Sequence, residues 1–158
     1  MKNKYNKIFI ILAFIGIIFS FQNSANSQTI TQIQQISFGT FVLNDFSNVG
    51  EITIDDDGTF SNNAYIYIIT DPQRGEYFTS SQPASTAYTI SVTPTSTTIN
   101  RLGNYLTIDN WTTGPATLVT NGSGEDTFYI GARMTSRGGG ITYADGLYTR
   151  TFNITLNW

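Results

Sequence analysis

The chain has 158 residues, about one domain's worth, with no cysteine, no histidine and only 12% charged residues. Catalysis by imidazole or thiolate is therefore excluded, and we expect neither an enzyme nor a cofactor. All three lysines lie within the first seven residues, so residues 28–158 carry five arginines against eleven acidic residues, a net charge of −6. Since nucleic acids and anionic membranes both attract basic patches, we expect neither as a partner.

Residues 1–27 have the pattern of a secretory signal peptide. Lysines precede an apolar run (Ile8–Phe21), and Ala25 and Ser27 occupy the positions that signal peptidase reads. The run is shorter than the roughly 20 residues that a helix needs to cross a bilayer. We therefore expect a mature chain of residues 28–158 with no membrane-spanning segment. It is secreted to the periplasm or the bacterial cell surface and is stable without disulfide bonds.

The mature chain is predicted to be all-β. Its apolar residues recur at a period of two and not at helical spacing, and Thr, Ile, Tyr and Phe, which favour strands, are abundant. Turn residues separate the runs at the intervals of a sandwich or barrel, which indicates a single antiparallel β-sandwich of about eight to nine short strands. In chain order we expect strands at Gln35–Leu43, Glu51–Ile54, Thr59–Ile69, Ala87–Thr93, around Leu106 and Ile108, around Leu118 and Val119, at Thr127–Met134 and at Tyr148–Trp158.

Two of these predictions are specific enough to be checked directly. Asp57 and Gly58 form an Asp-Gly pair, which supplies the positive φ of a tight hairpin turn. The strand that follows, Thr59–Ile69, is apolar on both faces, which is typical of a central strand.

The C-terminal strand has the clearest alternation in the chain. One interpretation of this segment is a core strand of an ordinary sandwich. A second is the last strand of an outer-membrane barrel, where such an alternation acts as the insertion signal. A third interpretation is an assembly strand, to which like subunits or a periplasmic chaperone add a strand. Arg150 is the one exception to the alternation, a charge on the apolar face. The other residues of that face are the candidate assembly residues: Tyr148, Phe152, Ile154, Leu156 and Trp158.

Several sequence blocks resemble, in order, a family of exported bacterial proteins catalogued as domain of unknown function 4402. The chain ending is also similar to that of spore-coat-U-type and fimbrial subunits. The resemblance implies an immunoglobulin-like sandwich at the cell surface, with no catalytic residues to transfer. The blocks are Ile36-Ser37-Phe38-Gly39-Thr40-Phe41, Gly50-Glu51-Ile52-Thr53-Ile54 with its Asp-Gly turn, Tyr88-Thr89-Ile90, Ile130-Gly131-Ala132, and Gly146-Leu147-Tyr148-Thr149-Arg150-Thr151-Phe152-Asn153-Ile154-Thr155-Leu156.

Other candidate sites have simpler explanations beside the functional ones. Asp55–Asp57 offers carboxylates for Ca²⁺, but without the alternating spacing of a calcium loop, and a solvated turn is the favoured explanation. Trp111 and Tyr143 are candidate contacts for a surface glycan, since exposed aromatic rings stack on sugars. The alternative for both rings is the core.

The sequence as a whole favours a non-enzymatic, exported structural or adhesive domain at the cell surface, as in a fimbrial-like assembly subunit. The alternatives left open are a carbohydrate-binding module and a small outer-membrane β-barrel.

Overall fold

The computed structural model describes residues 28–158, so the expected signal peptide lies outside the described residues. In this part the chain is all-β, and no helix in it has the length and hydropathy needed to span a membrane. The strands are β1 (Thr29–Gln34), β2 (Thr40–Leu43), β3 (Glu51–Ile54), β4 (Phe60–Asn62), β5 (Ile66–Thr70), β6 (Gly75–Ser80), β7 (Thr89–Thr93), β8 (Thr97–Arg101), β9 (Asn104–Gly114), β10 (Asp126–Ser136) and β11 (Asn153–Asn157).

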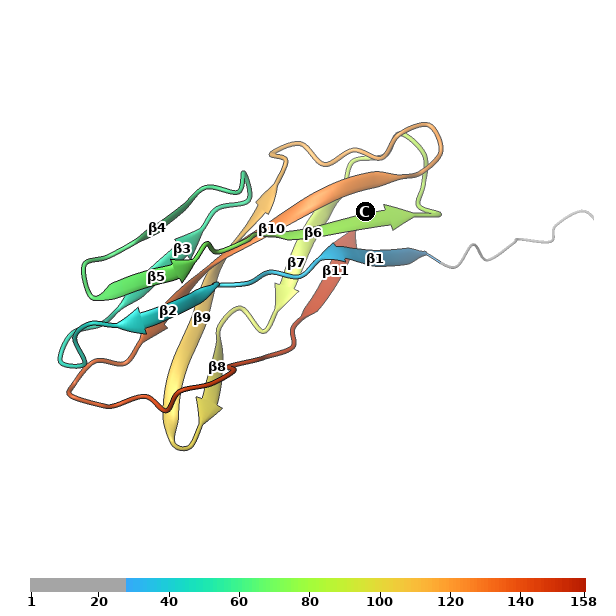
Figure 1. Cartoon of the computed structure of the whole chain (residues 1–158). Helices are drawn as coiled ribbons and strands as arrows, with labels where there is room; N and C mark the ends of the chain where they lie inside the picture. Colours follow the sequence, from blue (N-terminus) through green and yellow to red (C-terminus); the bar gives the residue numbers. More distant parts are fainter. Residues whose placement is uncertain (1–27) are drawn as a thin grey trace, which may run out of the picture.

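The larger layer is a seven-stranded antiparallel sheet built around β10 (Figure 1). One edge of β10 pairs with β9, which in turn pairs with β8. The other edge pairs with β6 over its first half and with β3 over its second half. Strand β1 lies outside β6 and β4 lies outside β3, so β1, β4 and β8 are the edge strands of this sheet.

The second layer consists of two separate two-stranded sheets, β2–β5 and β7–β11. Residues 29–43 and 66–80 form one long antiparallel ribbon. At one end of this ribbon β1 pairs with β6, in the middle Ser37 and Gln73 form a bridge, and at the other end β2 pairs with β5. The ribbon bends near Gly39, where φ is +71° and a side chain would collide with the backbone oxygen of Thr70. Glycine therefore allows this ribbon to leave the large sheet and to form part of the second layer.

Each small sheet closes one half of the core. The β2–β5 sheet supplies Phe41 and Leu43 to a first cluster that includes Ile52 and Ile54 of β3. The β7–β11 sheet covers a second cluster of Tyr77, Tyr88, Val92, Leu118, Phe128 and Ile130. This two-layered arrangement confirms the all-β sandwich predicted from the alternation, because apolar inner faces meet between the layers.

The Asp-Gly hairpin is confirmed. Strands β3 and β4 pair antiparallel around the turn, Gly58 has a φ of +91°, and its N–H donates to the carbonyl oxygen of Asp55 over 3.0 Å.

Some strand predictions are wrong in extent or in kind. The strand expected at 59–69 is divided into β4 and β5 by a turn, and β5 pairs with β2 alone, so it is not a central strand. Its second apolar face is open to solvent, with Tyr67 63% and Ile69 57% exposed. Of the strand expected at 35–43 only β2 is formed, the last is confined to β11, residues 118–119 contribute an isolated bridge and no strand, and β1, β6 and β8 were not expected.

Candidate functional site

The C-terminal strand β11 forms one wall of the candidate site. It pairs with β7 along its whole length, and its other edge has no strand partner among residues 28–158. Phe152, Ile154 and Leu156 pack against the second core cluster, as the alternation predicts. The Phe152 ring lies 4.8 Å from that of Trp111, between ring centroids. One face of the strand therefore packs against the core, and one of its backbone edges has no strand partner among the described residues.

The other two candidate assembly residues lie differently. Trp158 follows β11 and its ring lies 4.9 Å from that of Tyr88, but it remains 43% exposed. Tyr148 precedes the strand and packs against the first core cluster, and its hydroxyl donates to the carbonyl oxygen of Ala144 over 2.8 Å. The five predicted residues thus belong to the two halves of the core and do not form one continuous strand face.

The first strand, β1, forms the opposite wall. It pairs with β6 and with no other strand in the described part of the chain. Unlike the inner strands, β1 is exposed on both faces, with Ile30 39% and Ile33 57% exposed. Its backbone edge and much of its apolar surface are therefore accessible.

An open groove of about 380 Å³ lies between β1 and β11. Ile30 and Gln32 line it from β1, Phe152 and Ile154 line it from the C-terminal segment, and Tyr77 of β6 forms part of it. The Tyr77 ring is buried and stacks on Phe128 at 5.5 Å, and burial raises the pKa of its hydroxyl above the ordinary 10.0. The buried Tyr77 ring is therefore held in place where it lines the groove.

Arg150 also lines this groove, beside Phe152 and Ile154. Its Nε donates to Oγ1 of Thr97, a residue of β8 that is only 6% exposed, over 3.1 Å. The sequence identified Arg150 only as a break in the alternation. The structure places it in the lining of the groove, hydrogen-bonded to β8.

The candidate glycan residues both pack against the core. Trp111 contacts both core clusters, and its indole N–H donates to the carbonyl oxygen of Pro94 over 3.2 Å. Tyr143 packs against the first cluster. Its hydroxyl accepts from the N–H of Arg137 and donates to the carbonyl oxygen of Tyr105, both over 2.8 Å. Glycan contact through these two rings stays a prediction, and their packing favours the core interpretation.

The acidic run at Asp55–Asp57 forms the hairpin turn. Asp57 accepts hydrogen bonds from the N–H and the hydroxyl of Thr59, over 2.8 and 2.7 Å, and these bonds lower the pKa of its carboxyl below the ordinary 3.8. Across residues 28–158, three or more metal-ligating side chains of the His, Cys, Asp or Glu type do not gather at any point. The turn geometry accounts for Asp57 without an ion.

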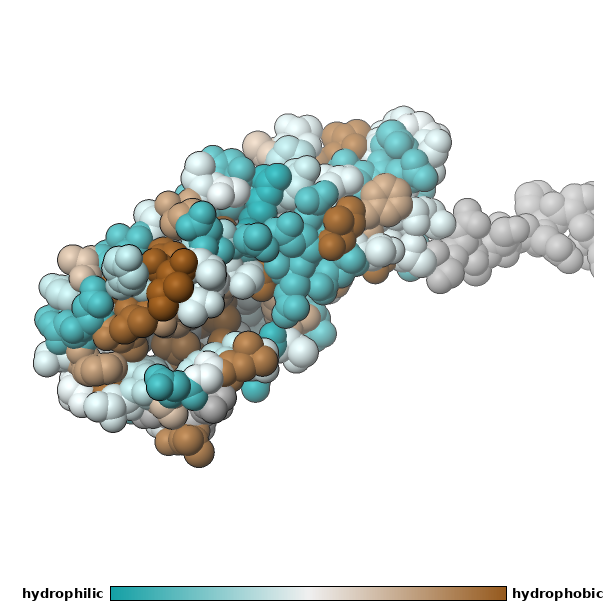
Figure 2. All heavy atoms as spheres, viewed as in Figure 1, coloured by the Kyte–Doolittle hydropathy of each residue, from teal (hydrophilic) through white to brown (hydrophobic). Residues whose placement is uncertain are grey.

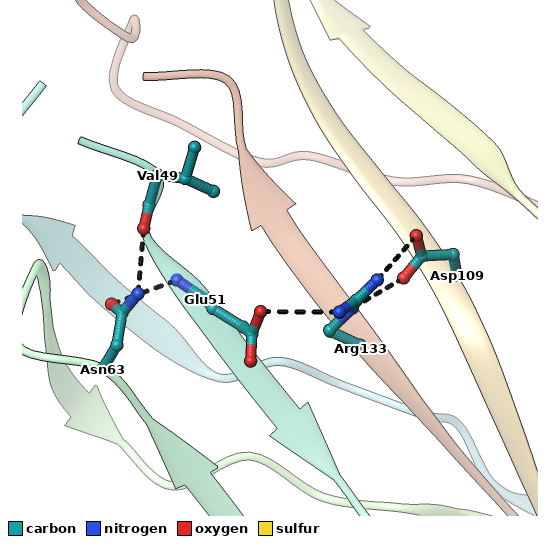
Figure 3. Close-up of polar contacts among 5 residues, drawn as sticks. All are labelled: Val49, Glu51, Asn63, Asp109 and Arg133. Atoms are coloured by element: carbon teal, nitrogen blue, oxygen red, sulfur yellow. Dashed lines mark hydrogen bonds and ion pairs between the residues drawn. The ribbon is translucent and has the colours of Figure 1, made fainter. Parts of the chain in front are cut away.

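An ion-pair network that the sequence did not indicate ties three strands together on the outer face of the large sheet (Figure 3). Arg133 of β10 donates to both carboxylate oxygens of Asp109 on β9, over 2.9 and 3.2 Å, and lies 3.7 Å from Glu51 on β3. The hydrogen bond to Asp109 raises the pKa of Arg133. Asn63 bridges the start of β3 by accepting from the Glu51 N–H and donating to the Val49 carbonyl oxygen. Because both carboxylates contact the guanidinium of Arg133, we assign this network a structural role.

The comparisons with known proteins give one match. The family model described as "Domain of unknown function (DUF4402)" matches residues 28–158, which is the whole of the part that the structure describes. No curated protein and no solved structure matches the chain.

Proposed function

We propose that this chain, which belongs to the DUF4402 family, is an exported structural subunit of a bacterial surface assembly, of the fimbrial-like kind, without enzymatic activity. Its role is to accept an extended segment of a neighbouring protein as an additional strand. The observation that carries the proposal is the pair of unpaired strand edges, β1 and β11, on either side of one open groove.

Strand addition is the binding mode that fits such a groove. An unpaired edge presents a row of N–H and C=O groups that an added strand can satisfy, and side-chain pockets beside it give specificity. Here a single inserted strand would meet an edge on each side, while its inward side chains would contact Tyr77, Phe152 and Ile154. The same strand would cover apolar surface that is open in the isolated subunit.

An exposed apolar surface on the β2–β5 sheet is a second supporting feature. Strand β2 continues the line of β1, and on the outer face of the β2–β5 sheet Val42, Tyr67 and Ile69 are 49%, 63% and 57% exposed. Figure 2 shows apolar surface gathered over these strands. Since contiguous exposed apolar surface marks interaction sites, this face fits a lateral contact with the partner that fills the groove.

The test uses native cells expressing the full chain with its own leader. Envelope proteins extracted without detergent are separated by size, and the chain is detected with an antibody. We expect it in species much larger than its monomer. A double variant, Gln32→Asp with Asn153→Asp, adds a negative charge to each wall of the groove, which opposes strand pairing. It should run as a monomer.

Thr98→Asp is the matched control, because Thr98 is an exposed residue of the edge strand β8 and does not line the groove. This variant should assemble as the wild type does. Finding only monomer for the wild type, or large species for the double variant, would contradict the proposal. Light scattering on purified residues 28–158 then tells whether copies of this chain alone suffice for assembly.

A further inference from the structure

Arg150 is the only charged side chain among the described residues that line the groove between β1 and β11. It stands on the apolar side of the C-terminal segment, in the company of Phe152 and Ile154. Within the part of the chain that the structure describes, no carboxylate lies within ion-pair distance of it, and the two ion pairs present both belong to Arg133. Its hydrogen bond to the buried hydroxyl of Thr97 holds the guanidinium beside the groove.

A strand inserted into the groove would lie over this guanidinium and remove water from it. Covering an unpaired charge is costly, whereas a charge that meets a counter-ion in the interface is tolerated or favourable. Binding of a strand with a neutral or basic side chain facing Arg150 therefore costs free energy. A strand with a carboxylate there binds without that cost. Specificity built in this way depends on rejecting the wrong strands as much as on attracting the right one.

We propose that the groove selects an extended partner segment that carries an acidic side chain, Asp or Glu, facing Arg150. This inference rests on the proposed strand-accepting function and adds the chemistry of the partner. The free edges of this chain do not meet the requirement, because β1 (TITQIQ) and β11 (NITLN) contain no acidic residue. Arg150 therefore disfavours pairing between the open edges of two copies and favours a segment of different sequence.

The test measures binding of labelled nine-residue peptides to residues 28–158 by fluorescence anisotropy. The peptides have blocked ends and alternate Val and Thr, and one Val position in turn is replaced by Glu, Gln or Lys. At one position the Glu peptide should bind about two- to fivefold more tightly than the Gln peptide, which is the range of a part-exposed ion pair, and the Lys peptide should bind most weakly. The difference should shrink at about 1 M salt, because salt screens exposed charges.

Two variants assign the effect to its residue. Arg150→Gln should abolish the difference between the Glu and Gln peptides, and Arg137→Gln, which removes an exposed arginine outside the groove, should retain it. Equal binding of the Glu, Gln and Lys peptides at every position would overturn the acidic requirement while leaving the strand-accepting function in place. Failure of every peptide to bind would remove that function, and the inference with it.

Discussion

Removal of β11 tests how much of the fold depends on the strand that borders the groove. Ending the chain at Arg150 deletes Phe152, Ile154 and Leu156, whose partial burial stabilises by about 1–2 kcal/mol each. It also deletes the ring contacts of Phe152 with Trp111 and of Trp158 with Tyr88, worth about 0.5–1.5 kcal/mol each. The expected loss is about 4–9 kcal/mol, comparable with the whole stability of a domain this size.

The assay is urea unfolding at 25 °C, followed by circular dichroism in the far ultraviolet so that the lost Trp158 does not affect the signal. The truncated chain should be largely unfolded without urea. A chain lacking Trp158 alone is the control, and it should lose only about 1–2 kcal/mol, because that side chain is 43% exposed. The reasoning is refuted if the free energy of unfolding of the chain that ends at Arg150 lies within about 1 kcal/mol of that of the full chain. In that case β11 is not part of the core as described, and the groove has no second wall.

Three further predictions concern the core and its response to pH. Trp111→Ala should lower the free energy of unfolding by about 3–5 kcal/mol in denaturant titrations, because the ring contacts both core clusters; a stable variant that loses only glycan binding would support the carbohydrate interpretation. Gly131→Ala should cost about 2 kcal/mol or more in the same assay, since its side chain would collide with the backbone oxygen of Ile54. Burial and the hydrogen bond to Asp126 raise the pKa of Tyr88 well above the ordinary 10.0. A group with a raised folded-state pKa stabilises fully below its unfolded pKa, so stability should fall as the pH rises above about 10, and less steeply in Tyr88→Phe.

The sequence predicted those strands whose two faces differ in burial. In β10, Phe128, Ile130, Ala132 and Met134 are buried, and the intervening side chains of Tyr129, Arg133 and Thr135 are less buried, as the period of two requires. The Asp-Gly pair predicted the β3–β4 turn for an equally local reason, since it needs a positive φ at one residue. In both cases the deciding information lies within a few neighbouring residues.

The strands that the sequence missed lack an alternation of apolar with polar residues, even where burial itself alternates, as it does in β6. Strand β1 is exposed on both faces, so its isoleucines need not alternate, and Ile30 and Ile33 lie three residues apart. Strand β6 follows Pro72 and begins with Gly75, two residues that locally disfavour a strand. It is held instead by strands on both sides, β1 and β10. The groove depends on β1 and β6, so it could not be located before the pairing of distant segments was known.

The two walls of the groove lack most of the devices that protect strand edges in monomeric proteins. Proteins blunt free edges with lysine, proline or inward-pointing charges. All three lysines of this chain fall within residues 1–27, and neither β1 nor β11 contains a proline or a charge. Arg150, on the apolar side of the segment before β11, is the one charged side chain among the described residues that line the groove. A lone charge in that position discourages pairing with neutral edges and permits pairing with an acidic strand, so one residue supplies both the protection of the free subunit and the selection of its partner.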